Sequence, residues 1–290
     1  MGSSEARPGP GACPDAIQYH YDLSNDFYAL WLDPGMNYSA AMFEDGDDLE
    51  SAQIRKLDYH IAESRASGKA RVLDIGCGWG SMLKRLVREH GVKNCVGLTL
   101  SDAQASKIRA DAVPGVNVRV ESWRDHKAEE PYDAIISVGA FEHFVHRNLT
   151  RAEKIAIYRD FFAFCHESLR PGAWLSLQTI CYGKLRAGGM DPFIEDAIFP
   201  ESDLPYPWEI LEAADGYFEL NRLRNDRRDY RRTTREWYRN LGEHRARAVE
   251  LLGEAKVEHY ERYLRISIGS FQMRALGLLR LTFERLGRNR

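Results

Sequence analysis

Short apolar runs alternate with stretches of helical periodicity between residues 66 and 180. The apolar runs predict five strands, at 71–75, 94–100, 116–120, 132–138 and 173–180. The stretches between them predict helices at 81–90, 102–112 and about 150–168, the last ended by Arg170-Pro171-Gly172. Strands that alternate with helices are typical of an α/β fold with a doubly wound, mostly parallel sheet. In such a sheet a ligand binds at the carboxyl ends of the strands.

The flanking segments depart from this alternation. Residues 1–14 are small, polar and rich in proline and glycine, which predicts a disordered tail ahead of a single domain at 15–290. Within that domain, residues 15–65 look like an N-terminal helical cap and 66–180 form the core. Residues 181–235 carry four prolines, several aromatic residues and an arginine-rich run, which we interpret as an insertion covering the ligand edge of the sheet. Residues 236–290 return to helical patterning and predict C-terminal helices.

Composition places the chain among ordinary globular proteins. The 290 residues are 44% hydrophobic and 29% charged, and the net charge of −3 would not recruit nucleic acid or an anionic membrane. No apolar run approaches the roughly 18–20 residues needed to span a bilayer, and no segment resembles a signal peptide. The five cysteines lack metal-ligand spacing, which predicts reduced thiols, no metal site and a cytoplasmic location.

A glycine-rich motif follows the first predicted strand. Residues 72–80 read Val-Leu-Asp-Ile-Gly-Cys-Gly-Trp-Gly, so Gly76, Gly78 and Gly80 follow an apolar strand that contains Asp74. Glycines allow a tight strand-to-helix turn and let a ligand approach the backbone closely, and the next helix offers its unpaired N–H groups. The spacing differs from the dinucleotide pattern G-x-G-x-x-G. It resembles motif I of class I S-adenosylmethionine methyltransferases, whose glycine loop cradles the methionine end of the cofactor.

Further strings extend the resemblance over about residues 17–286. On the N-terminal side they are residues 18–28 (Gln-Tyr-His-Tyr-Asp-Leu-Ser-Asn-Asp-Phe-Tyr), 32–34, 38–39, 51–53, 97–101 and 137–144. On the C-terminal side they are residues 198–200, 204–205, 229–230, Thr234, Trp237 and 260–264 (Tyr-Glu-Arg-Tyr-Leu). The chain resembles the cyclopropane fatty acid and mycolic acid cyclopropane synthase family. This resemblance implies a Rossmann-like fold and an S-adenosylmethionine-dependent enzyme, and it is much less specific for the substrate.

The resemblance also implies cofactor contacts. From the methionine moiety to the adenine, they are Tyr38, Ser39, Asp74, Gly76, Gly78, Gly80, Thr99, Gln104, Ser122, Trp123 and Gly139. Thr99 and Gln104 would take the ribose, because the second strand ends without the acidic residue common in other methyltransferases. Trp123 would offer a flat apolar face to the adenine, with core burial as the alternative. Arg124 stands where the family often has an acidic residue.

The family chemistry is an S-adenosylmethionine-dependent attack on a carbon–carbon double bond. An alkene is a poor nucleophile, so most of the catalytic help is positioning. Methyl transfer leaves a carbocation, which aromatic faces stabilise by about 0.5–2 kcal/mol each. By motif position, the candidate aromatic residues are Tyr21, Tyr38, Phe141, Tyr230 and Trp237. The alternative for each of them is core packing.

The predicted base site departs from the family. There, a bound bicarbonate accepts the proton and is held by a Cys, a Glu, a His and a Tyr. Glu142 and Tyr230 are present, whereas the Cys position is Ala40 and the His position is Gln178, which argues against bicarbonate binding. Ala40 widens the substrate pocket, and Gln178 can donate an N–H but carries no charge. We therefore assign catalytic roles to Glu142, Tyr230 and Gln178, with Glu142 acting as base or countering the cation; alternatively, Glu142 only caps neighbouring backbone.

Two further features are open to more than one interpretation. The eight arginines between residues 222 and 239 form either a solvated helical face balanced by carboxylates, or an anion site for a phosphate, diphosphate, carboxylate or carrier-protein surface. The first interpretation is favoured, although the run flanks Tyr230. A diphosphate substrate would also require magnesium. We expect His143 and His146 to be structural.

Three functions remain open. The first is C-methylation of an alkene or electron-rich carbon of a small apolar natural product, isoprenoid or polyketide-like, through a carbocation that resolves by proton loss or cyclisation. The second is cyclopropanation of an unsaturated acyl chain of a lipid, and the third is cofactor binding without catalysis. We rank them in this order because the cofactor motifs are intact while the base site is altered. The expected partner is a small-molecule or lipid-like substrate; peripheral membrane contact and a monomeric or homodimeric state remain open.

Overall fold

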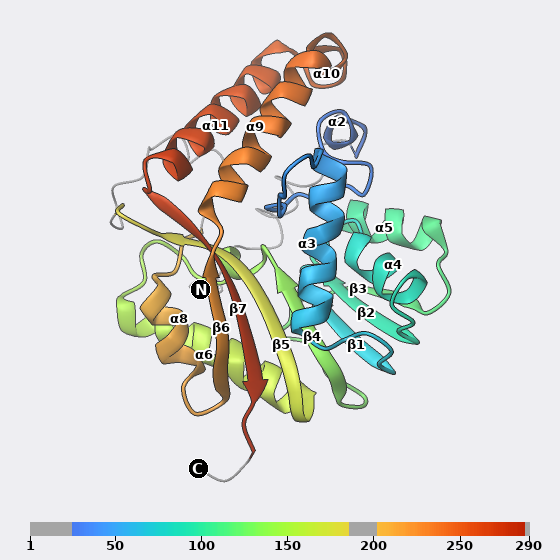
Figure 1. Cartoon of the computed structure of the whole chain (residues 1–290), viewed down its shortest axis with the longest axis vertical. Coiled ribbons are helices and arrows are strands. Elements are labelled where there is room, and N and C mark those ends of the chain that lie inside the picture. Colours follow the sequence, from blue (N-terminus) through green and yellow to red (C-terminus); the bar gives the residue numbers. More distant parts are fainter. Residues whose placement is uncertain (1–24, 186–201, 288–290) are drawn as a thin grey trace, which may run out of the picture.

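The computed structural model describes residues 25–185 and 202–287 (Figure 1). Its strands are β1 (Arg71–Ile75), β2 (Asn94–Thr99), β3 (Val116–Val120), β4 (Tyr132–Val138), β5 (Leu169–Tyr182), β6 (Phe218–Asn225) and β7 (Leu276–Arg285). Its helices are α2 (Asn25–Ala29), α3 (Leu49–Glu63), α4 (Ser81–Arg88), α5 (Asp102–Asp111), the 3-10 turn η1 (Phe141–His143), α6 (Arg151–Ser168), α8 (Pro207–Ala214), α9 (Arg227–Glu243), α10 (Arg245–Leu252) and α11 (Glu254–Gln272). The predicted tail at 1–14 and Tyr21 lie outside the described residues.

The seven strands form one sheet in the order β3-β2-β1-β4-β5-β7-β6. The five strands predicted from the sequence are parallel neighbours within it. Strand β5 begins earlier than the predicted residue 173, because Leu169 already pairs with Tyr132 of β4. Helix α6 matches the predicted helix and starts at a capping box between Thr150 and Glu153. The α/β fold with a doubly wound sheet is confirmed.

Helices cover both faces of the sheet and bury two apolar layers (Figure 1). On one face, α3, α4 and α5 pack against the parallel strands through a core of aliphatic side chains that includes Ile61, Leu83 and Ile108. On the other face, α6 and α8 pack through a core rich in aromatic rings, with Phe161 and Phe162 fully buried. Both faces of the central strands are therefore dry, which explains their near-continuous apolar sequences.

Helices α9 to α11 account for residues 236–272 as expected, whereas two strands correct the rest: β7 stands at 276–285 in place of a helix, and β6 lies within the expected covering insertion at 181–235. Strand β7 inserts antiparallel between β5 and β6, and β6 forms the sheet edge. The run from Leu276 to Phe283 is apolar at most positions because β7 is covered on both faces. Periodicity alone does not separate such a buried strand from a buried helix. Residues 186–201 of the expected insertion lie outside the described residues.

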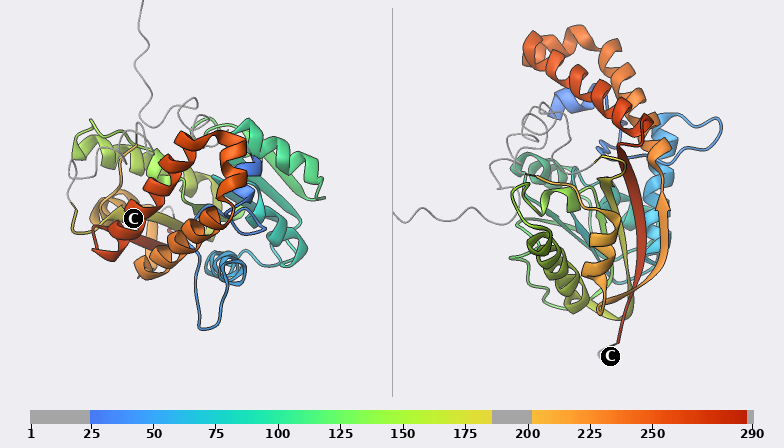
Figure 2. Two further views of the ribbon diagram at one scale, coloured as in Figure 1. Left: turned by 90° about the horizontal axis from the view of Figure 1, so that it is seen from above. Right: turned by 90° about the vertical axis from the view of Figure 1, so that its left-hand side faces the viewer.

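Helices α9, α10 and α11 stand together beyond the carboxyl ends of the parallel strands (Figures 1 and 2). With α2 and the segment after it they bury a third core, which contains Trp31, Trp79, Tyr230 and Trp237. This aromatic core roofs the edge of the sheet at which a ligand is expected. None of the helices within 25–185 and 202–287 is long and apolar enough to cross a membrane.

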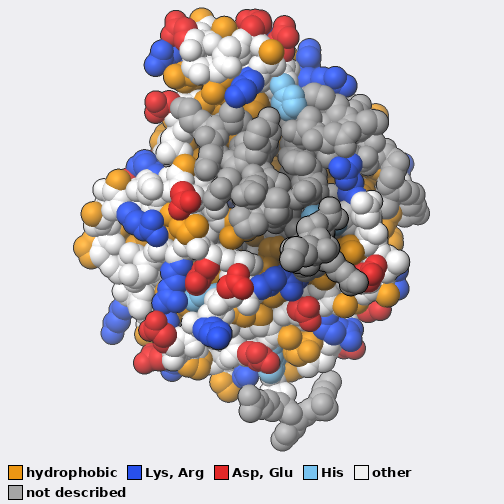
Figure 3. All heavy atoms as spheres, turned by 180° about the vertical axis from the view of Figure 1, so that it is seen from behind, with side chains coloured by type: hydrophobic (Ala, Val, Ile, Leu, Met, Phe, Trp, Pro, Cys, Tyr) orange, Lys and Arg blue, Asp and Glu red, His pale blue; other side chains and the backbone are white. Residues whose placement is uncertain are grey.

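Seen from behind, the described part of the surface carries acidic and basic side chains in alternation (Figure 3). This distribution matches the small net charge of −3. Over the same ranges no group of three or more His, Cys, Asp or Glu side chains is arranged to hold a metal ion.

Candidate active site

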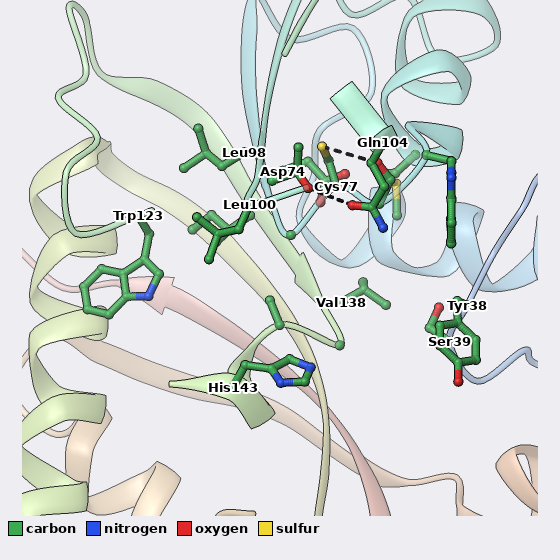
Figure 4. Close-up of a pocket in the computed structure, with 18 of the residues that line it drawn as sticks. Tyr38, Ser39, Asp74, Cys77, Leu98, Leu100, Gln104, Trp123, Val138 and His143 are labelled. Atoms are coloured by element: carbon green, nitrogen blue, oxygen red, sulfur yellow. Dashed lines mark hydrogen bonds between the residues drawn. The ribbon is translucent and has the colours of Figure 1, made fainter. Parts of the chain in front are cut away.

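A cavity of about 670 Å³ opens at the carboxyl ends of β1, β2 and β4. Its volume lies within the range typical of cofactor and ligand pockets. Figure 4 shows Trp123 at one side of this cavity and Tyr38 with Ser39 at the opposite side, with Asp74 and Gln104 between them. Ten of the predicted cofactor residues lie in its wall: Tyr38, Ser39, Asp74, Gly76, Gly78, Thr99, Gln104, Ser122, Trp123 and Gly139.

The glycine turn is required by its geometry. Gly76, Gly78 and Gly80 all have positive φ, at 80°, 52° and 81°, which side chains other than glycine rarely tolerate. A Cβ on Gly76 would lie 2.5 Å from the Cβ of Ala140, and one on Gly80 would lie 2.8 Å from Ile108. Gly78 has open space around its Cβ position, so its backbone is accessible from the cavity. Gly80 is the N-cap of α4, whose N-terminus follows directly.

A short polar network lies in the cavity wall after β2. The Thr99 hydroxyl donates to Oε1 of Gln104 at 2.7 Å, and the Ser101 hydroxyl caps α5 by accepting from the Gln104 backbone N–H. Gln104 is held through its oxygen, which leaves its amide N–H groups to face a ligand. Thr99 and Gln104 are thus in contact in the cavity wall, and their binding of the ribose stays a prediction.

The end of the cavity away from Tyr38 and Ser39 is formed by Trp123 and its aromatic neighbours (Figure 4). Trp123 is 7% exposed, and its ring packs against Phe144 and Phe161 while one face lines the cavity. The Arg124 guanidinium lies 4.4 Å from the Trp123 ring centroid, and Arg124 also lines the cavity. His143, which we expected to be structural, also lines the cavity, and burial lowers its pKa to about 4. The imidazole is therefore neutral at neutral pH.

Lys56 is a cavity residue that the sequence analysis missed. Its ammonium group is buried on α3 and donates to Ser39 Oγ at 3.0 Å and to Asn37 Oδ1 at 3.3 Å. Burial lowers its pKa to about 8, against the attraction of nearby carboxylates that include Asp74. Burial likewise raises the pKa of Asp74 to about 7, opposed by Lys56. The signal was present in the sequence, since Gln53, Lys56 and His60 recur at helical spacing on the side of α3 that faces the sheet.

Glu142 stands in η1, directly after β4, and is 3% exposed. Its Oε1 accepts a hydrogen bond from the backbone N–H of Ile180 at 2.6 Å. Its Oε2 is buried and has no hydrogen-bond partner within the described residues. Burial raises the pKa of Glu142 to about 7, although the Ile180 N–H lowers it. A carboxylate with one unpaired buried oxygen is poised to accept a proton.

Gln178 belongs to a buried network that the sequence analysis did not foresee. Its Oε1 accepts from Nε of Arg280 at 2.8 Å and lies 3.2 Å from Nε2 of His60. Arg280, fully buried on β7, also donates to the carbonyl oxygens of Ala40 and Ala41 and pairs with Asp226. Arg280 thus joins the loop after Ser39 to strands β5 and β7. The polar oxygen of Gln178 is engaged in this network, and so is the Ala40 carbonyl.

The aromatic candidates separate into two groups. Tyr38, Tyr230 and Trp237 lie in the core that roofs the cavity, with ring centroids 5.2 Å apart for Tyr38–Trp237 and 6.0 Å apart for Tyr230–Trp237. Phe141 is fully buried in the core beside α6 and stacks on Tyr158 at 4.4 Å, which favours core packing over the predicted substrate contact. Further roof residues that the sequence analysis did not name are Tyr28, Trp31, Trp79 and Tyr260.

Comparisons with known proteins agree with this arrangement. The family model for mycolic acid cyclopropane synthetase matches residues 12–281. Cyclopropane mycolic acid synthase MmaA2 of Mycobacterium tuberculosis is 35% identical over 283 residues, which span 91% of this chain and 93% of that protein. The cyclopropane-fatty-acyl-phospholipid synthase of Escherichia coli is 32% identical over 268 residues, which span 92% of this chain and 66% of that protein.

A solved structure shows the same fold with a bound cofactor product. Mycolic acid cyclopropane synthase CmaA1, complexed with S-adenosylhomocysteine (SAH) and CTAB, superposes with a TM-score of 0.85 at 31% identity, covering 94% of this chain and 99% of that one. The glycine turn, the Thr99–Gln104 pair and the aromatic end of the cavity fit the same cofactor. The chain belongs to the mycolic acid cyclopropane synthetase family and is an S-adenosylmethionine-dependent methyltransferase.

Proposed function

We propose that this enzyme adds one carbon to the double bond of an unsaturated acyl chain on a lipid and closes it to a cyclopropane. The observation that carries this proposal is the buried Glu142 carboxyl, whose Oε2 has no partner in the described ranges. The names of the relatives, which match over most of this chain, support an acyl lipid as the substrate. They support it better than the small natural product that the sequence analysis ranked first.

Different residues of the cavity would bind different parts of the cofactor. The glycine turn and the N-terminus of α4 would bind its methionine end, Thr99 with Gln104 its ribose, and Trp123 its adenine. S-adenosylmethionine supplies an electrophilic methyl group on a positively charged sulfur. Lys56 holds the Ser39 hydroxyl at the same end of the cavity, so it would keep the loop that carries Tyr38 and Ser39 closed over the site.

The aromatic roof would hold the alkene and the cation that it becomes. Transfer of the methyl carbon to the double bond would form one C–C bond, break the carbon–sulfur bond with its electron pair left on sulfur, and leave the other alkene carbon electron-deficient. Tyr38, Tyr230 and Trp237 lie close together above the sheet edge, and aromatic faces attract such a cation by about 0.5–2 kcal/mol each. A dry aromatic surface also excludes water, which would otherwise trap the cation as an alcohol.

Glu142 would then complete the ring. One C–H bond of the added methyl group breaks, and its electron pair forms the second C–C bond to the cationic carbon. The proton passes to Oε2 of Glu142, the oxygen without a partner, while Oε1 stays bound to the Ile180 N–H. The products are a cyclopropane and SAH, and the protonated carboxyl later returns its proton to solvent.

The residues present do not fit a bound bicarbonate. Of the four side chains that the family resemblance implies, the Cys position is Ala40, which has no polar group, and the His position is Gln178, a neutral amide that is already held through its Oε1 by Arg280 and His60 and cannot carry a positive charge. No step is therefore assigned to bicarbonate, and Glu142 itself is the proton acceptor. The same two substitutions favour a second candidate function, in which a small natural-product alkene is methylated and the cation loses a proton without closing a ring.

A paired substrate assay tests the proposal. The enzyme is incubated with S-adenosylmethionine and phospholipid vesicles whose acyl chains are either cis-unsaturated or saturated. Release of SAH and the mass gain of one methylene, with loss of the alkene protons in the NMR spectrum, are expected only with the unsaturated lipid. Methylated products that retain a double bond would replace cyclopropanation by the second candidate. No turnover on acyl lipids, together with turnover on isoprenoid or polyketide alkenes, would overturn the lipid substrate.

A further inference from the structure

Four arginines gather where α9 begins and α11 ends. Arg231 lies four residues after Arg227 and three after Arg228 in the first turns of α9, so both are its neighbours on the helix surface. Arg274 follows the end of α11, in a left-handed conformation with φ of 63°. Its carbonyl accepts from the backbone N–H of Lys184 at 2.8 Å, which brings a further cation to the same place. We call these five residues the basic cluster.

Among residues 25–185 and 202–287, no carboxylate pairs with the cationic side chains of the basic cluster. Arg228, Arg231 and Arg274 make no ion pair or hydrogen bond through their side chains to any residue that the structure describes. Nε of Arg231 is buried without a partner. Burial and then the charges of Arg274, Arg228 and Arg231 all lower the pKa of Arg227, and no carboxylate opposes them.

The carboxylates nearest in sequence face elsewhere. Asp226, just before α9, pairs with Arg224 and Arg280 on the sheet side of the helix. Asp229 is half-buried on that same side, where Arg280 is the main cation that stabilises its charge. Four arginines held together without counter-ions repel one another, so the basic cluster is complementary to an anion with several acceptor oxygens.

The basic cluster adjoins the aromatic roof of the active site. Arg227 donates to the backbone carbonyl of Phe271, and the Phe271 ring stacks on Tyr230 at 4.6 Å. Beside Arg274, the apolar side chain of Met273 is 69% exposed. An exposed apolar side chain among unpaired cations is typical of a surface that contacts the headgroup layer of a membrane.

We propose that the basic cluster binds the phosphate of an anionic lipid headgroup at a membrane surface, with Met273 inserted at the level of the acyl chains. The headgroup would then rest outside the Tyr230–Phe271 stack while an acyl chain of the same bilayer reaches the cavity. The inference rests on the lipid substrate proposed above. Under this proposal, the start of the arginine-rich run is a docking site and not only a solvated helix face.

Vesicle binding of the full-length enzyme tests the inference without any turnover. Flotation with phosphatidylcholine vesicles is compared with flotation on vesicles that also contain phosphatidylglycerol, at low and high salt. Retention only on the anionic vesicles, lost at high salt, is expected because the attraction between phosphates and surface arginines is screened by ions. Each arginine contributes about fivefold to such binding, so Arg228→Gln with Arg231→Gln lowers partitioning at least about tenfold.

The control variant is Arg239→Gln with Arg247→Gln. It removes the same charge from α9 and α10, but from arginines that pair with Glu236 and Glu250 on the surface, and it should float like the wild type. Arg274→Asn is a second test that spares the fold, because asparagine tolerates a positive φ better than other residues. Equal losses in the control and cluster variants would show a net-charge effect and overturn the site.

Two other outcomes would also overturn it. One is equal retention on neutral and anionic vesicles, and the other is binding of inorganic phosphate, seen by calorimetry, without any binding to vesicles. Because flotation needs no cofactor, an enzyme that binds anionic vesicles but forms no cyclopropane would refute the proposed reaction and leave the docking site standing. The reverse result would refute the docking site alone.

Discussion

The guanidinium of Arg280 on β7 donates from Nε to Oε1 of Gln178 on β5 at 2.8 Å, and both side chains are buried. Arg280 shares its remaining donors among Asp226 and the carbonyl oxygens of Ala40 and Ala41. Gln178 stands where the family resemblance implies a histidine, and its neutral amide oxygen accepts this bond from the guanidinium. Arg280 also links β7, which the sequence periodicity did not reveal as a strand, to the loop that lines the cofactor cavity.

Replacement of Arg280 by methionine should destabilise the fold strongly. The Arg280→Met variant leaves Asp226 without its buried partner and two carbonyl oxygens without donors. Breaking a buried ion pair on one side costs about 3–5 kcal/mol, which urea denaturation would measure as a lower midpoint with an unchanged slope. Adding Asp226→Asn should recover part of this loss. Arg222→Met, which removes an exposed pair with Glu63, is the matched control, and an equal loss there would refute the role of Arg280.

Glu142→Gln should abolish most turnover while leaving cofactor affinity intact. The amide keeps the acceptor for the Ile180 N–H but cannot take a proton, so turnover should fall by about 10²–10⁴-fold. In the wild type, turnover should rise with pH through about 7, because the base must be ionised and burial raises the Glu142 pKa to about 7. Calorimetry with SAH should give the same dissociation constant for both proteins. Unchanged turnover would remove the catalytic assignment.

The same variant should become more stable than the wild type at alkaline pH. Between the usual pKa of 4.5 and about 7, folded Glu142 holds a proton that the unfolded chain has lost. The stability that this proton contributes is complete below pH 4.5 and is lost as the pH rises through 7. Glu142→Gln removes this titration. Between about pH 5 and about pH 8, the free energy of unfolding of the wild type should therefore fall by about 2 kcal/mol more than that of the variant. Parallel pH profiles would contradict the raised pKa.

Lys56→Met should weaken cofactor binding. The variant removes the donor that holds Ser39 Oγ and Asn37 Oδ1, and it leaves Asp74 buried without its nearby cation. Loss of such a buried donor costs about 1–3 kcal/mol, so the dissociation constant of SAH should rise about tenfold. Lys84→Met, which removes a surface pair with Asp111, is the control and should bind normally. Normal binding by Lys56→Met would place Lys56 outside the cofactor site.

Turnover should not depend on bicarbonate. Ala40 offers no polar group and Gln178 cannot carry the positive charge of a histidine, so removal of dissolved bicarbonate should leave the wild-type rate unchanged. The pair Ala40→Cys with Gln178→His restores both family residues and is the test of whether a site can be rebuilt. A wild-type rate that rises with added bicarbonate would show that the ion binds despite both substitutions.

The cofactor half of the molecule was predictable because its signals are local. A strand, a glycine turn and a helix follow one another at 71–88, and positive φ at Gly76 and Gly80 can be inferred from residue type. Thr99 and Gln104 lie only a few residues apart on consecutive elements, so their contact also follows from the chain order. The same locality explains why the five parallel strands were found.

The residues missed or misplaced depend on contacts between distant segments. Phe141 and Glu142 are neighbours in one motif, yet Phe141 turns into the core beside Tyr158 while Glu142 reaches the Ile180 backbone. Which side of the sheet each faces is decided by the direction in which η1 leaves β4, and no pattern in the motif encodes it. Arg280 looks like an isolated charge in sequence, and only its burial reveals that it needs partners.

The sequence by itself determined the family, the cofactor and the parallel part of the sheet, because hydrophobic period and glycine spacing act over a few residues. Tertiary structure alone decided that β7 is a strand rather than a helix, that Arg280 engages Gln178, and that Arg274 lies beside the arginines of α9. These contacts join residues that are tens of positions apart. Their energies come from burial and charge pairing in the folded chain, which no local pattern records.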